Sequence, residues 1–176
     1  METNNQRKTP TVLVPYDFGP KAKTALQEAI KVADFIKGQI YLLSVLQSSN
    51  FFTELFKSEK QQREERRHVE NKLKEVILEQ AQIRNAQYII MGKMSSTVSA
   101  FHFIGPLTMH IIASAPCPVI TVSENSIENG RFDNILLPID LSKQTLEKIN
   151  AAISWAKYYK STVHLVGVVK RGTNLV

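Results

Sequence analysis

The feature that most constrains the fold of this chain is an internal repeat. The segment from Thr11 to Asp17 reappears from Asn134 to Asp140, which places the second copy 123 residues after the first. The match continues without a gap through three consecutive elements, and in each copy an apolar run ends in a Pro-x-Asp sequence. Chance similarity between two amphipathic helices would not also align both of their flanking apolar runs. The chain therefore contains a duplicated unit.

Each copy has the pattern of a strand, a helix and a second strand. The apolar runs that end at Asp17 and Asp140 are typical of strands buried on both faces. Residues 40–46 and 163–169 are the second strands, so each copy is a β-α-β unit with parallel strands. The helix between the strands carries an apolar stripe for packing on a sheet. The stripe consists of Ala25, Leu26, Ala29, Ile30 and Ala33 in the first copy, and of Leu146, Ile149, Ala152, Ile153 and Ala156 in the second.

Several residues mark the expected ends of these helices. Pro20 suits the first turn of the first helix, because its missing N–H has no partner in a helix there. Ser142 is a good N-cap for the helix of the second copy. Gly38 is placed to end the first helix in the left-handed conformation.

The remainder of the first copy completes an α/β module. A long polar helix is expected over 59–82, a strand over 88–91, a loop over 92–105, a short helix from Pro106 and a strand over 119–122. The pattern predicts an open, mostly parallel sheet with helices on both faces. The predicted organisation is a polar N-terminal tail over 1–10, a module over 11–123, a linker over 124–131 and a partial second module over 132–176.

Composition and charge narrow the classes of function. The net charge is +6, but the excess is diffuse, and the most charged stretch mixes both signs at helical spacing. Such a stretch is typical of a solvated helix, and no nucleic-acid-binding motif accompanies it. The four histidines are scattered, which argues against a metal site. A single cysteine, Cys117, favours a reducing compartment and a packing role. With no apolar stretch of about 20 residues, we expect a cytoplasmic protein without membrane or nucleic-acid partners.

Several of these strings resemble the universal stress protein family. The apolar strand ending in Asp17, the Ala-rich helix and the strand ending in Ser44-Val45-Leu46 resemble the start of a family module. The segment Ala86–Gly92 resembles its fourth strand and glycine corner. The string Ala115-Pro116-Cys117-Pro118-Val119 resembles its closing strand and is the most family-specific string. The resemblance covers 11–122 and resumes over 132–170, as in tandem members of the family.

The chain departs from the family pattern in two places. Family modules carry a third strand between the two helices that follow the second strand. Here the two helices are joined directly near Val76-Ile77, so the third strand is expected to be missing. The second copy stops after strand, helix and strand, which leaves unpaired strand edges. We expect that this sequence omits segments of a longer tandem protein, rather than that the product is truncated.

The resemblance also implies a ligand site at the carboxyl ends of the strands. In the nucleotide-binding branch of the family, a G-x2-G-x9-G-[S/T] motif cradles the phosphates of ATP. Its first and third glycines match Gly92 and Gly105, whereas Ser95 and Pro106 stand at its second and fourth positions. Ser95 adds a Cβ and Pro106 removes a hydroxyl and an N–H, so the resemblance implies weak ATP binding at most. The implied ligand contacts are Pro15, Tyr16, Asp17, Val45, Met91, Gly92, Ser95 and Gly105.

Asp17 has two interpretations that the sequence leaves open. A carboxylate at the end of a buried strand accepts hydrogen bonds from turn amides and helps to begin the next helix. It also lies where ligands bind in open α/β sheets. The repeated Asp140 fits either interpretation.

These observations predict a stress-response module that acts through protein association and is not an enzyme. Self-association is expected through the edge strand Val119–Val122 or through the partial second module. The residues by themselves assign no cofactor, and ATP is the one cofactor that the resemblance suggests. The alternative is a nucleotide-dependent switch or slow ATP hydrolase that uses Asp17 and the Gly92–Gly105 loop. A scaffold with vestigial sites is a third interpretation.

Overall fold

The computed structural model describes residues 9–44, 58–93, 105–123, 132–140 and 145–167. The chain divides into two compact units, Met1–Ser126 and Ile127–Val176. The first unit contains strands β1 (Thr11–Pro15), β2 (Gln39–Leu43), β3 (Ala86–Gly92) and β4 (Val119–Val122), with helices α1 (Pro20–Ile36), α3 (Glu59–Ile83) and α4 (Pro106–Ser114). The second contains β5 (Asn134–Ile139), α5 (Thr145–Tyr159) and β6 (Thr162–Gly167).

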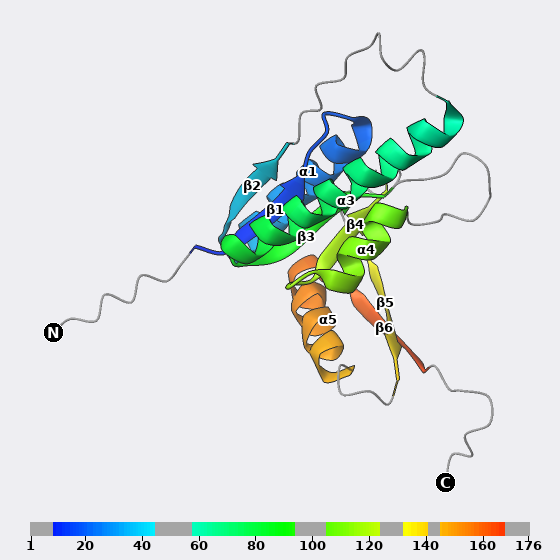
Figure 1. Ribbon diagram of the computed structural model, residues 1–176. Helices are drawn as coiled ribbons and strands as arrows, with labels where there is room; N and C mark the ends of the chain where they lie inside the picture. The colour runs from blue at the N-terminus through cyan, green and yellow to red at the C-terminus, as the bar shows by residue number, and fades with distance from the viewer. Residues whose placement is uncertain (1–8, 45–57, 94–104, 124–131, 141–144, 168–176) are drawn as a thin grey trace, which may run out of the picture. The chain divides into compact units, whose positions relative to one another are not determined.

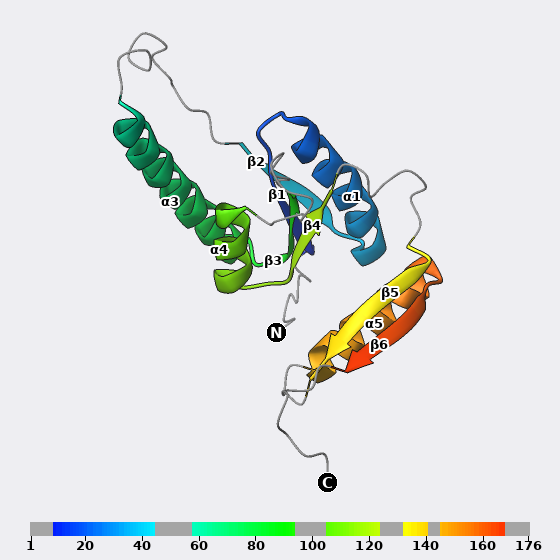
Figure 2. The same cartoon turned by 90° about the vertical axis from the view of Figure 1, so that its right-hand side faces the viewer.

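The first unit is a parallel sheet between two layers of helices. Its strand order is β2-β1-β3-β4, and every neighbouring pair is parallel. Helix α1 covers one face, and α3 and α4 cover the other (Figures 1 and 2). The core under α3 and α4 joins Leu13 and Ile89 of the sheet to Ile77 and Ile111 of the helices. The predicted open parallel sheet with helices on both faces is confirmed.

Helix α1 begins as expected and ends differently. Pro20 occupies its first turn, in agreement with the sequence. Its left-handed residue is Lys37, with φ of 52°, and not Gly38 as we expected. Gly38 serves another purpose, because a Cβ there would lie 2.5 Å from the carbonyl oxygen of Pro10. A glycine is therefore required at this position by the close approach of the backbone.

The packed stripe of α1 is displaced around the helix from the one that the sequence suggested, since it also includes Ala22, Glu28 and Val32. Ala25, Ala29 and Ala33 are buried, but Ile30 is exposed. Small alanine side chains let the helix approach the sheet closely. Ile30 follows Ala29 by one position around the helix, so its side chain points away from the sheet. In α5 only Ala152 of the expected stripe is buried, and Leu146 and Ile153 are exposed.

Helix α3 runs unbroken through the expected join of two helices. It begins with a capping box, in which the Ser58 side chain and the Gln61 side chain bond each other's backbone N–H. It passes through Val76-Ile77 without interruption, so no strand separates the two helical segments there. Its last turns bury Ile77 and Ala81, while its N-terminal part is exposed. After it, the Arg84 guanidinium lies 3.8 Å from the centre of the Tyr41 ring.

The second unit is a two-stranded parallel sheet with one helix. Strands β5 and β6 pair from Asn134↔Thr162 to Ile139↔Gly167, and α5 connects them. The turn after α5 has the geometry of the turn after α1: Lys160, like Lys37, has a positive φ. The expected N-cap Ser142 lies outside the described residues. None of the helices in the described parts of the chain has the length and apolar composition to cross a membrane.

Candidate functional site

The candidate site lies where the strand order of the first unit reverses. The chain leaves β1 toward β2 on one side, and its later strands, β3 and β4, lie on the other side. The carboxyl ends of β1 and β3 therefore flank a switch point, which is the usual ligand position in open α/β sheets. Pro15 ends β1, and Met91 and Gly92 end β3. The backbone N–H of Tyr16 donates to the carbonyl of Leu43 at 2.8 Å, which ties this edge to β2.

Asp17 holds the turn that leads into α1. The backbone N–H of Gly19 donates to Asp17 Oδ1 at 2.9 Å, and the side chain is exposed. The sequence left two interpretations of Asp17 open, and this contact is the structural one, in which the carboxylate accepts from a turn amide. Among the described residues, this hydrogen bond engages Oδ1 alone.

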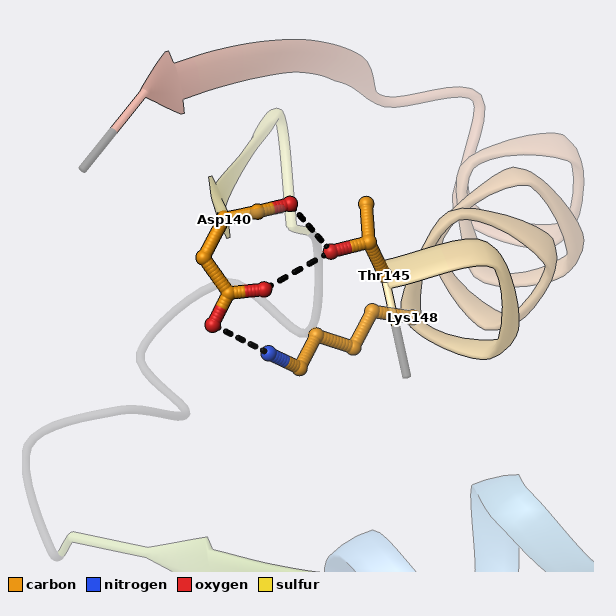
Figure 3. Close-up of polar contacts among 3 residues, drawn as sticks. All are labelled: Asp140, Thr145 and Lys148. Atoms are coloured by element: carbon orange, nitrogen blue, oxygen red, sulfur yellow. Dashed lines mark hydrogen bonds and ion pairs between the residues drawn. The ribbon is translucent and has the colours of Figure 1, made fainter. Parts of the chain in front are cut away.

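The second aspartate of the repeat is held by more contacts. The Thr145 hydroxyl lies 2.8 Å from Asp140 Oδ1 and 2.7 Å from the Asp140 carbonyl oxygen, and it donates to them. Lys148 Nζ lies 3.9 Å from Oδ2, so both carboxylate oxygens have a partner on α5 (Figure 3). The positions of Thr145 and Lys148 are occupied in the first copy by Ala22 and Ala25, which offer no polar group. The two aspartates therefore share a sequence position but not an environment.

An aromatic pair beside Asp17 was not anticipated. Phe18 has φ of 64° and is 64% exposed. A bulky side chain rarely adopts this left-handed conformation, which costs about 1–3 kcal/mol. The Phe18 ring packs edge-on against Tyr16, with ring centres 5.1 Å apart. No sequence pattern distinguishes such a residue from an ordinary position before a helix.

Gly92 packs against α1. A Cβ on Gly92 would lie 2.6 Å from the carbonyl oxygen of Lys21, in the first turn of the helix. This close approach explains why residue 92 is a glycine, and no bound phosphate is needed to explain it. Of the other expected contacts, Gly105 is the N-cap of α4, whereas Val45 and Ser95 lie outside the described residues.

The two helices that begin at this edge start in the same way. Gly19-Pro20 begins α1 and Gly105-Pro106 begins α4, and neither glycine can supply a capping side chain. A helix N-terminus attracts anions through its free N–H groups and its dipole. Proline at the first helical position removes one of those N–H groups. Both helices therefore offer a phosphate fewer donors than an ordinary helix start.

Cys117 lies two residues before β4, at the amino ends of the strands, and its side chain is half-buried. Burial raises the pKa of the Cys117 thiol, and the side chain packs against the core under α3 and α4. A raised pKa disfavours the reactive thiolate. Among the described residues, no group of three or more histidine, cysteine, aspartate or glutamate side chains is placed to hold a metal ion.

Comparison with known proteins finds a family match over part of the chain and a shared fold over most of it. Residues 52–123 match the model of the universal stress protein family. Among solved structures, a universal stress protein from Archaeoglobus fulgidus aligns with 92% of this chain and 68% of its own length, at 16% identity and a TM-score of 0.64. A functionally unknown protein from Pseudomonas aeruginosa aligns with 90% of this chain and 60% of its own length, at 16% identity and a TM-score of 0.65. At this identity the likeness concerns the fold. No curated protein matches the chain.

Proposed function

Residues 52–123 match the universal stress protein family, and from that premise we propose that the chain is a non-enzymatic module that acts by protein association. The observation that carries the proposal is the open edge of β4. Strand β4 is last in the order β2-β1-β3-β4, so one side of it has no neighbouring strand among the described residues. An exposed strand edge is a ready template for pairing with another chain.

The backbone groups available at this edge follow from the hydrogen bonds on its other side. The carbonyls of Pro118 and Val122 accept from Ile89 and Lys93 of the β3 side, at 3.0 and 2.6 Å. Backbone groups alternate in direction along a strand. Val119 and Thr121 therefore direct their N–H and C=O groups away from β3. These are the groups that a second strand would meet.

A proline placed on the open side of β4 tests the proposal. Thr121→Pro removes an outward N–H and leaves the hydrogen bonds to β3 in place. We expect the wild-type chain to self-associate in sedimentation equilibrium. The dissociation constant of the proline variant should be higher by about tenfold or more, because a proline on a strand edge opposes strand pairing. Thr121→Ala is the matched control, because it loses the same side chain but keeps the N–H. A wild-type chain that is monomeric throughout, or a proline variant that associates like the control, contradicts the proposal.

A nucleotide-dependent switch or slow ATP hydrolase is the second candidate. It is supported by the position of Asp17 and Gly92 on either side of the switch point and by the exposed carboxylate of Asp17. Pro20 and Pro106 argue against tight phosphate binding. The packing of Gly92 against Lys21 explains why this residue is a glycine without a role in ligand binding. We therefore rank association above nucleotide binding.

A further inference from the structure

We draw no further inference here: the strongest candidate, the apolar surface patch that Met109 and Ile112 expose on α4, carries nothing, because the part of the chain that the structure describes does not show what covers it.

Discussion

At the scale of single residues, Asp17 and Asp140 show how little a repeated motif says about a role. Both end a strand in the same Pro-x-Asp sequence. Asp140 is engaged by Thr145 and Lys148, whereas Asp17 accepts one backbone N–H, from Gly19. The difference arises from the residues one turn into the following helix, which are alanines in the first copy. Within the described parts of the chain, Asp17 is therefore the less engaged of the two aspartates.

The nucleotide hypothesis can be tested at Asp17. We expect titration of Mg²⁺ and ATP into the protein to give at most weak, millimolar binding by calorimetry, because both nearby helices begin with proline. Asp17→Ala removes the turn contact and the charge, and it should cost about 1 kcal/mol of stability. Asp17→Asn is the control, since its amide oxygen still accepts from Gly19.

Micromolar ATP binding that both Asp17 variants abolish would make the switch the leading function. Binding lost in Asp17→Ala but kept in Asp17→Asn would assign the residue to the turn and not to the ligand. An absence of heat at millimolar ATP would leave association through β4 as the proposed function.

At the scale of elements, α3 combines two parts with different environments. Its first turns are charged and exposed, and its last turns carry Ile77 and Ala81 into the core. Ser58 and Gln61 begin it with a capping box, so the start is specified locally. Its attachment depends on a few apolar residues against β3 and α4. The helix is therefore held near its C-terminal end.

Two isoleucines of α3 make a matched test of this attachment. Ile77 is fully buried, whereas Ile83 is 59% exposed in the last turn. Ile77→Ala should lower the free energy of unfolding by about 2–5 kcal/mol, because it removes buried methylenes and leaves a cavity. Ile83→Ala should change it by about 0.5 kcal/mol or less, as surface substitutions do. Chemical denaturation measures both. Equal losses would mean that the C-terminal end of α3 does not form the core described here.

At the scale of the whole molecule, the proposed association surface belongs to one of two compact units. The open edge of β4 lies in the first unit, Met1–Ser126. An edge that pairs with the same edge of a second copy closes on itself, so assembly through β4 alone stops at a dimer.

Association through β4 alone predicts a defined end point. At high concentration the wild-type chain should form dimers and no larger species, whereas Thr121→Pro should be a monomer with the wild-type circular dichroism spectrum. Sedimentation velocity measures both. Wild-type species larger than dimers, or a Thr121→Pro variant that still forms dimers, would reveal a further surface.

The sequence alone determined the order and type of the elements. Hydrophobic periodicity, the Pro-x-Asp endings and the repeat itself act locally, so the β-α-β pattern, α4 from Pro106 and β4 over Val119–Val122 could be predicted. The continuous α3 also followed from the absence of a turn near Val76-Ile77. The resemblance of a few strings was enough to indicate the family.

Only the tertiary structure decided what the individual residues do. Gly92 and Gly38 are glycines because a Cβ would collide with a backbone carbonyl oxygen, that of Lys21 in α1 and that of Pro10, respectively. The left-handed residue after α1 is Lys37. Leu13 and Leu136 look alike in sequence, yet one is buried and the other exposed. Such differences depend on atoms that are distant along the chain and close in space. Local patterns specify which elements form, and packing between elements specifies which side chains remain available for function.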